Sequence, residues 1–218
     1  MKVLLLGATG RLGRCVLRDL VDSGHTVHVL ARYKERLPFE HPNVKVYIGN
    51  VSDEGHLWKA LQGCEAVLNV LNISRNSDFP WAKLRTPVTL LSTTMKALIK
   101  VMNSCQVKRV VVTTAWGVGD SWREVPRWFR WLIEHSNIRY AYQDHQRQEK
   151  LLQSSGLDWT IVRPTGLTNS PKIRKLVISQ RGKPRPYLVI SRSHVSRMIV
   201  NTLEAREYVG EMVTISEK

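Results

Sequence analysis

The feature that most constrains the fold is a short apolar run, residues 3–6, that leads directly into a glycine-rich turn. A buried strand that ends on glycines and opens a helix is typical of a dinucleotide-binding turn. Gly7 permits the sharp turn, Gly10 lets a pyrophosphate approach the backbone, and Gly13 lets the helix pack closely on the strand. A glycine turn without a ligand is the competing interpretation, but the preceding strand and the amphipathic stretch that follows favour a nucleotide. The predicted phosphate site consists of Gly7, Thr9, Gly10, Arg11, Leu12 and Gly13.

Strand-like and helix-like segments alternate after this turn. The expected strands are residues 26–30, 44–48, 66–71, 110–112 and 159–162. The expected helices are residues 11–21 and 53–61, a long helix after Pro87, and one that ends near Ser155. This alternation predicts an α/β fold, a Rossmann-like doubly wound parallel sheet with helices on both faces, in which the strand ends form one ligand-binding edge.

The C-terminal residues 165–218 show a different pattern, because Pro171, Gly182, Pro184 and Pro186 interrupt them. A short strand is expected at residues 187–190, a helix at 193–203 and a final strand at 212–215. We expect this part to form a small substrate-side lobe that folds back on the sheet. Residues 1–218 are therefore predicted to form a single domain.

The composition is that of an ordinary globular chain, with 43% hydrophobic and 23% charged residues. No apolar stretch approaches the roughly 18 residues that span a bilayer, and the chain begins with a strand rather than a signal peptide. Cys15, Cys64 and Cys105 are scattered and lack histidines at ligand spacing. They predict reduced thiols, no metal site and a cytoplasmic location.

The formal net charge of +15 indicates attraction to anions. Residues 159–203 contain no acidic residue but many basic ones: Arg163, Lys172, Arg174, Lys175, Arg181, Lys183, Arg185, Arg192 and Arg197. These residues fit a phosphate-bearing cofactor, an anionic substrate or nucleic acid, and they also fit a solvated basic face. No helix-turn-helix, zinc or RNA-binding motif supports nucleic acid as the partner.

Arg32, at the end of the second expected strand, predicts that the dinucleotide is NADP(H). Enzymes that use NAD place an acidic residue there to bind the ribose 2′-hydroxyl, whereas a guanidinium binds a 2′-phosphate with two hydrogen bonds. Lys34 and Arg36 are possible helpers, and Arg11 adds positive charge inside the phosphate turn.

Two further strand ends carry candidate cofactor residues. Asn50 and Val51 follow the third strand, where an amide oxygen can accept from the adenine amino group and an apolar side chain can cover its face. Leu71 and Asn72 end the fourth strand, where the backbone is expected to pass the nicotinamide ribose. Asparagine is also common in ordinary turns, so a purely structural role is the alternative.

Nearly the whole chain resembles the atypical short-chain dehydrogenase/reductases, the NAD(P)H-binding, NmrA-like group. The segments that carry the resemblance are Gly7 to Gly13, Ala31-Arg32, Gly49-Asn50-Val51, residues 107–112 and residues 155–164. Within this group the chain is most similar to the biliverdin-IXβ reductase and NADPH-dependent flavin reductase type. That similarity rests on Arg32 with Arg36-Leu37-Pro38, on Asp144-His145-x-Arg147-x-x-Lys150, and on Val189-Ile190-Ser191-Arg192.

The Ser-Tyr-Lys triad that most short-chain reductases use is absent in this alignment. The serine position falls on Ala115, the tyrosine position on Ala141 and the lysine position on His145. Reduction of an extended conjugated system still needs only a hydride from the cofactor, with a proton from solvent or a loosely placed donor. Thr114 is a candidate to bind the carboxamide or the acceptor, and His145 is either a proton donor or a structural helix residue.

An aromatic and basic segment follows the fifth strand and is expected to border the nicotinamide. It contains Trp116, Trp122, Trp128, Phe129 and Trp131, interleaved with Arg123, Arg127 and Arg130. Such rings either stack on a flat substrate or pack as a hydrophobic cap or dimer contact. Trp116 is the best candidate for a wall of the substrate site.

These features together predict an NADPH-dependent reductase of a planar, anionic acceptor such as a flavin or a linear tetrapyrrole. The alternative is a non-catalytic NADP(H)-binding redox sensor of the NmrA-like type, which the missing triad favours. A nucleic-acid-binding protein is a third interpretation that rests on charge alone. The expected oligomeric state is a monomer or a weak dimer, with no membrane partner.

Overall fold

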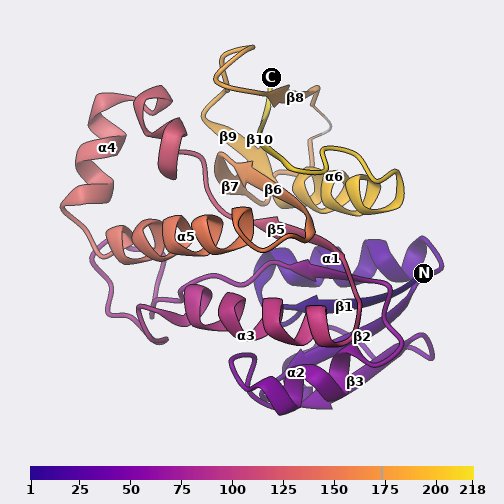
Figure 1. Ribbon diagram of the computed structural model, residues 1–218. Coiled ribbons are helices and arrows are strands. Elements are labelled where there is room, and N and C mark those ends of the chain that lie inside the picture. The colour runs from indigo at the N-terminus through magenta and orange to yellow at the C-terminus, as the bar shows by residue number, and fades with distance from the viewer. Residues whose placement is uncertain (173) are drawn as a thin grey trace.

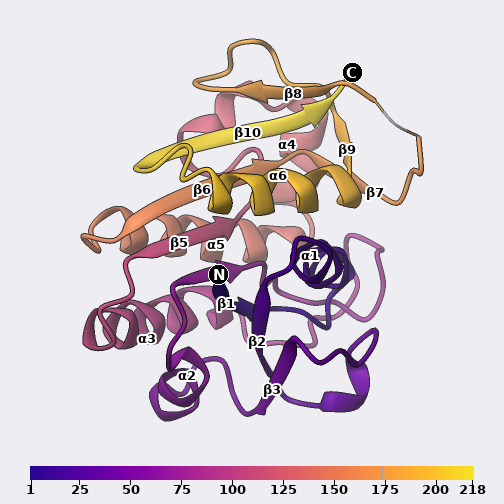
Figure 2. The same cartoon turned by 90° about the vertical axis from the view of Figure 1, so that its right-hand side faces the viewer.

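The computed structural model describes residues 1–172 and 174–218. Its centre is an eight-stranded sheet with the order β3-β2-β1-β4-β5-β6-β10-β8, and Figure 2 shows these strands from β8 at the top to β3 at the bottom. Every neighbouring pair in the sheet is parallel except β10 with β8. The strands are β1 (Lys2–Leu6), β2 (Thr26–Ala31), β3 (Val44–Ile48), β4 (Ala66–Asn69), β5 (Arg109–Thr113), β6 (Asp158–Pro164), β8 (Leu176–Ser179) and β10 (Glu211–Glu217).

Helices cover both faces of the sheet (Figure 1). One face carries α1 (Arg11–Asp22) and α6 (Arg192–Glu204), and the other carries α2 (Glu54–Leu61), α3 (Leu90–Ser104) and α5 (Ile138–Gln153). The shorter α4 (Arg127–Glu134) packs on α5, outside these two layers. Among the described residues, no helix has both the length and the apolar character of a membrane span.

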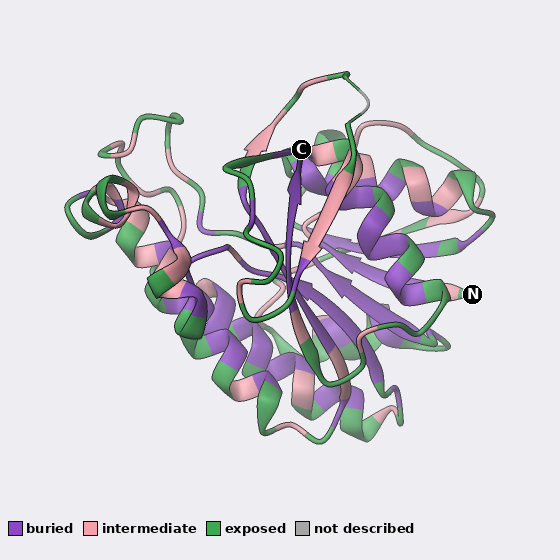
Figure 3. Ribbon diagram, turned by 90° about the horizontal axis from the view of Figure 1, so that it is seen from above, coloured by how far each residue is buried: buried purple, intermediate pink, exposed green. Residues whose placement is uncertain are grey.

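The strands are apolar on both sides because each side faces a helix layer. Val3 and Leu5 of β1 pack in the core beside α1 and α6, whereas Leu4 and Leu6 pack against α2 and α3. This alternation follows the two-residue period of a strand. Figure 3 shows the buried strands in the centre and exposed residues on the outer sides of the helices.

The predicted fold class is confirmed: the chain forms a doubly wound, mostly parallel sheet of the Rossmann type. Most predicted elements agree with the structure to within one or two residues at each end. The sequence prediction missed β8, α4 and the short strand β7 (Gly166–Thr168), which pairs with β9 (Val189–Ser191) outside the main sheet.

The C-terminal residues 165–218 fold back on the sheet and contribute to its main layers. β10 lies in the main sheet beside β6, and α6 packs against α1. Ser196 Oγ donates to the Asp19 carboxylate, and His25 Nε2 lies 2.7 Å from Glu204 Oε1. Because apolar residues of α6 and β10 fill the same core as α1, the C-terminal part completes the sheet.

Candidate functional site

The glycine turn forms a tight cradle between β1 and α1. Gly7 has φ +93°, a conformation that favours glycine, and its carbonyl accepts a hydrogen bond of 2.9 Å from the Gly10 amide. A Cβ on Gly13 would lie 2.0 Å from the Gly7 oxygen, so this position also requires glycine. The turn therefore brings bare backbone to the start of α1, as a dinucleotide pyrophosphate requires.

A cavity of about 470 Å³ extends from this turn along the carboxyl ends of β1 and β2. Six of the predicted cofactor residues line it: Gly7, Thr9, Arg32, Asn50, Val51 and Leu71. The opposite wall comes from the start of α3 and the segment before it, with Thr86, Pro87, Thr89, Leu90 and Thr93. The sequence prediction missed that wall, since no motif marks it.

The other predicted cofactor residues lie around the cavity rather than in its lining. Gly10 and Arg11 begin α1, and Leu12 and Gly13 are buried beneath the turn. Asn72 is exposed, and its Oδ1 accepts a hydrogen bond of 2.8 Å from the Ile73 amide. Asn50 does line the cavity, but its Oδ1, predicted to accept from adenine, accepts from the Ser52 amide at 3.0 Å and holds the loop after β3.

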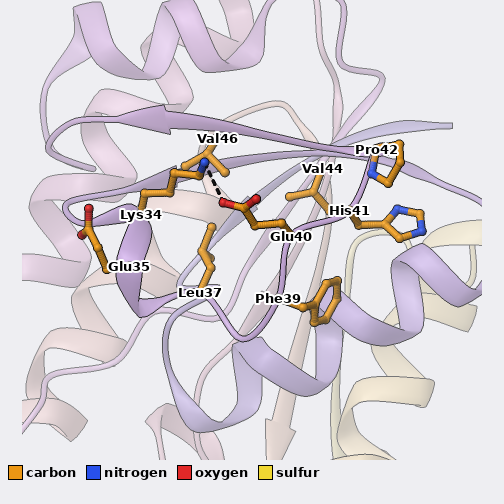
Figure 4. A pocket seen from close by; sticks show the side chains of 9 residues that line it. All are labelled: Lys34, Glu35, Leu37, Phe39, Glu40, His41, Pro42, Val44 and Val46. Atoms are coloured by element: carbon orange, nitrogen blue, oxygen red, sulfur yellow. Dashed lines mark ion pairs between the residues drawn. The ribbon is translucent and has the colours of Figure 1, made fainter.

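Arg32 is exposed at the cavity and lies directly after β2, so the residue at this strand end is basic and not acidic. The two predicted helpers point elsewhere. Lys34 Nζ lies 2.7 Å from Glu40 Oε1 in a second hollow, of about 760 Å³, which Figure 4 shows from close by. The Arg36 guanidinium lies over the Tyr33 ring, 4.9 Å from its centroid. Arg32 alone among these three lines the glycine-turn cavity.

The turn and the cavity fit NAD(P)H. The glycines keep the turn free of side chains at positions where a Cβ would collide with backbone. The first backbone amides of α1 can donate to phosphates, and the Arg32 guanidinium suits a ribose phosphate. The residues that would hold the cofactor are therefore the glycine turn, Arg32, Val51 and Leu71.

A buried polar network lies at the end of β5, which is on the opposite side of β1 from β2 in the sheet. Thr114 Oγ1 donates a hydrogen bond of 2.7 Å to Glu149 Oε1 on α5. Glu149 in turn binds Arg163 of β6 through two hydrogen bonds, and Arg163 Nη1 also donates to Asp120 Oδ1 at 2.6 Å. The hydroxyl hydrogen of Thr114 is therefore committed to Glu149, and its oxygen can act toward a ligand only as an acceptor.

The expectation that His145 donates a proton does not fit its surroundings. The ring is 2% exposed, and its Nδ1 lies 3.2 Å from Gln148 Oε1. Burial lowers the pKa of His145, which favours the neutral ring over an imidazolium that could donate a proton. A structural role in α5, the alternative given by the sequence, suits this buried residue. Ala141, at the tyrosine position of the family, is also buried and has no proton to donate.

The prediction that Trp116 walls the substrate site also needs correction. Its side chain is 3% exposed, and its Nε1 donates to Glu124 Oε2 at 3.1 Å. A ring that stacks on a ligand must offer one open face, which this ring does not. The exposed rings of the aromatic segment are instead those of Trp128 and Trp131 on α4.

Asp144 holds the start of α3, which forms one wall of the cavity, in place. This buried carboxylate on α5 accepts from the Leu91 and Ser92 amides at 2.7 and 3.2 Å, and from Ser92 Oγ at 2.5 Å. It thereby caps the first turn of a helix far away in the sequence. The capped turn holds Leu90 and Thr93 in the cavity lining.

Several curated proteins are similar to this chain in sequence. The (4-alkanoyl-5-oxo-2,5-dihydrofuran-3-yl)methyl phosphate reductase of Streptomyces griseus is 26% identical over 98% of this chain and 67% of its own length. The chain spans between 59% and 94% of the length of the first three curated relatives that it matches.

Two solved structures share the fold over nearly the whole chain. A short-chain dehydrogenase/reductase from Veillonella parvula in complex with NADP has a TM-score of 0.82 and 21% identity, covering 99% of this chain and 94% of that one. ChuY, an anaerobilin reductase from Escherichia coli O157:H7, has a TM-score of 0.80 and 19% identity, covering 100% and 97%. The sequence profile of a family described as NAD(P)H-binding matches residues 7–206, and the chain belongs to that NAD(P)H-binding family of oxidoreductase type.

Proposed function

We propose that this chain is an NADPH-dependent reductase that passes a hydride to a planar, conjugated and anionic acceptor, such as a flavin or a linear tetrapyrrole. The observation that carries the proposal is the combination of a dinucleotide cradle with a β5 end at which neither predicted catalytic residue, Thr114 or His145, is free to act as an acid. Thr114 donates its hydrogen to Glu149, and burial of His145 favours its neutral ring. Acceptors that take a hydride without help from an enzyme acid fit such a site.

The choice of NADPH over NADH rests on Arg32. Its guanidinium lines the cavity at the end of β2, where it can bind a 2′-phosphate through two parallel hydrogen bonds. A carboxylate at this strand end would instead select the free ribose hydroxyl of NADH.

The chain's own residues contribute binding and orientation. Bound NADPH would supply the hydride, while the protein holds the cofactor and sets the approach of the acceptor. The buried Glu149 holds Thr114 with its oxygen available as an acceptor, which suits the amide N–H₂ of a carboxamide. Solvent supplies the proton to the reduced acceptor, because an extended conjugated system delocalises the negative charge and stabilises the anion until it is protonated.

The names of two similar proteins support a reductase of this kind. The Streptomyces griseus relative is a reductase of a phosphate-bearing compound, and the structural neighbour ChuY is an anaerobilin reductase. The acceptor class is our proposal for this chain.

The test is a steady-state assay of NADPH oxidation at 340 nm with flavins, linear tetrapyrroles and quinones as acceptors. We expect turnover with at least one planar acceptor, and slower turnover with NADH. Tight NADPH binding without reduction of any acceptor above the uncatalysed rate would contradict the proposal and would favour the redox-sensor alternative.

A further inference from the structure

Two arginines stand at the starts of two neighbouring helices. Arg11 is the first residue of α1 and Arg192 is the first residue of α6, and these helices pack against each other. Neither helix has an acidic residue in its first turn. A cation at the positive end of a helix is unfavourable by itself, so each of these positions gains from a nearby anion.

An internal carboxylate already lies at this place. Asp78, on the connection between β4 and α3, accepts hydrogen bonds of 2.8 and 2.5 Å from the two Nη atoms of Arg11. The pKa of Asp78 is lowered by these hydrogen bonds and by the nearby charges of Arg11, Arg192 and Arg75. Arg11 therefore contacts the carboxylate directly, and the positive charges of Arg75 and Arg192 act on it as well, so the cluster keeps an excess of positive charge.

Two of the three guanidinium groups have hydrogen-bonding capacity to spare. Arg75 Nε is buried and has no hydrogen-bond partner among the described residues. Arg192 Nη1 donates to Asn169 Oδ1 at 2.6 Å, and Asn169 follows directly after β7. Arg75 and Arg192 are both half-buried, so each charge is partly removed from water, and this burial lowers the pKa of each guanidinium. A second anionic group would satisfy these donors.

The cluster lies at the ligand-binding edge of the sheet. Arg11 starts α1 at the glycine turn, Arg75 lies on the connection after β4, and Arg192 starts α6 after β9. In sheets of this kind ligands bind outside the carboxyl ends of the strands, so a molecule that lies against the cofactor there comes within reach of these arginines. A planar guanidinium fork matches a carboxylate or a phosphate in geometry and charge.

We propose that Arg11, Arg75 and Arg192 bind the carboxylate or phosphate group of the acceptor, and that Asp78 is the internal anion which this group displaces from Arg11. The proposal rests on the proposed reductase function, because it assigns a subsite for the anionic part of that acceptor. It predicts that charge on the acceptor, apart from its conjugated ring, determines affinity.

Paired acceptors that differ only in their anionic group test the proposal. The phosphate pair is FMN and riboflavin, and the carboxylate pair is biliverdin and its dimethyl ester. Dissociation constants are measured by fluorescence quenching on the protein saturated with NADP⁺, so turnover is not required. We expect the anionic member of at least one pair to bind about tenfold more tightly, and the pair that shows the difference identifies phosphate or carboxylate as the group.

Substitutions then assign the difference to the cluster. Arg192→Met and, independently, Arg75→Met should remove most of the preference while leaving the affinity for the uncharged member and for NADPH nearly unchanged. Asp78→Asn should act in the opposite direction and strengthen binding of the anionic member. Arg18→Met, an equal loss of charge at an exposed position of α1, is the matched control and should preserve the preference.

Three results would overturn the proposal. The first is equal affinity for the two members of each pair, and the second is a preference for the anionic member that survives both arginine substitutions. The third is a loss of NADPH affinity as large as the loss of affinity for the anionic acceptor, which would assign the cluster to the cofactor pyrophosphate. A clear preference without NADPH oxidation would instead contradict the reductase function alone, so the two failures are distinguishable.

Discussion

Glu149 and Arg163 form a buried ion pair that joins α5 to β6. Arg163 Nη2 lies 2.7 Å from Glu149 Oε2, and Nε lies 3.0 Å from Oε1. Their side chains are 3% and 4% exposed. Through Thr114 and Asp120 the same pair also reaches the end of β5 and the turn after it. Thr114, Glu149, Arg163 and Asp120 thus form one hydrogen-bonded network next to the proposed site of hydride transfer.

Removal of one member of this pair should be costly, because it leaves a buried charge without its partner. Glu149→Leu is expected to lower the free energy of unfolding by about 3–5 kcal/mol. The double substitution Glu149→Leu with Arg163→Leu should cost less than the sum of the two single ones. Urea unfolding of the four proteins measures this, and strict additivity would contradict an energetic link between them.

Replacement of Asp144 should loosen the start of α3. Asp144→Ala leaves the Leu91 and Ser92 amides without their acceptor and leaves the Ser92 hydroxyl with only the Thr89 carbonyl, at 3.3 Å. We expect a loss of at least about 2 kcal/mol in the free energy of unfolding. NADPH affinity should also fall, because the start of α3 lines the cavity. Thermal unfolding and NADPH titration measure the two effects. Asp22→Ala, at the exposed end of α1, should change neither.

A side chain on Gly10 should block the phosphate site without unfolding the protein. Gly10 has φ −76° and ψ 164°, which other residues adopt readily, and a Cβ there would lie 3.3 Å from the Gly7 carbonyl oxygen in the phosphate turn. Gly10→Val should therefore abolish measurable NADPH binding by calorimetry while the circular dichroism spectrum is retained. Gly55 lies on α2, and a Cβ there would be 3.3 Å from Oδ1 of Asp53, so Gly55→Val adds a comparable side chain away from the turn and should bind NADPH normally. Unchanged affinity in folded Gly10→Val would show that the phosphates bind elsewhere.

Reversal of the charge at Arg32 should reverse the choice of cofactor. The unmodified protein is expected to bind NADPH at least about tenfold more tightly than NADH, a difference of about 1.4 kcal/mol. Arg32→Glu repels the 2′-phosphate and accepts from the ribose hydroxyls, so it should remove or invert this ratio. Lys59→Glu makes the same change of charge on α2, outside the cavity lining, and should leave the ratio intact. Dissociation constants for both cofactors decide the matter.

The buried histidine predicts a loss of stability in acid. The pKa of His145 in the folded protein lies below its ordinary value of 6.5 because of burial. As the pH falls below about 6.5, the unfolded chain binds a proton that the folded protein does not, so the free energy of unfolding decreases. One such group contributes at most about 1.4 kcal/mol per pH unit.

Urea unfolding at pH 7.5 and pH 5.5 measures this dependence, the two values chosen on either side of about 6.5. His145→Gln should reduce the difference in unfolding free energy between them. His41→Gln changes an exposed ring and should keep the difference of the unmodified protein. If the His145 variant keeps it too, the acid dependence has another source, such as His28, whose pKa is also lowered by burial.

The sequence alone determined those properties that depend on neighbouring residues. The glycine turn was recognisable because Gly7 and Gly13 satisfy local backbone requirements within one strand–turn–helix unit. The alternation of apolar strands and amphipathic helices predicted the sheet, because the spacing of apolar residues that distinguishes a strand from a helix is visible within a short stretch of sequence. Arg32 was predictable for the same reason, because a fixed spacing along the chain brings it to the cavity.

Only the tertiary structure decided which distant side chains meet and which become buried. Arg11 meets Asp78 across 67 residues, and Asp144 caps a helix that begins more than 50 residues before it; neither pairing leaves a local signal. The burial of Trp116 and His145 likewise depends on what packs against them, so their polar or aromatic character suggested functional roles that their surroundings do not support. β8 was missed because a short edge strand is stabilised by pairing with β10 rather than by its own pattern.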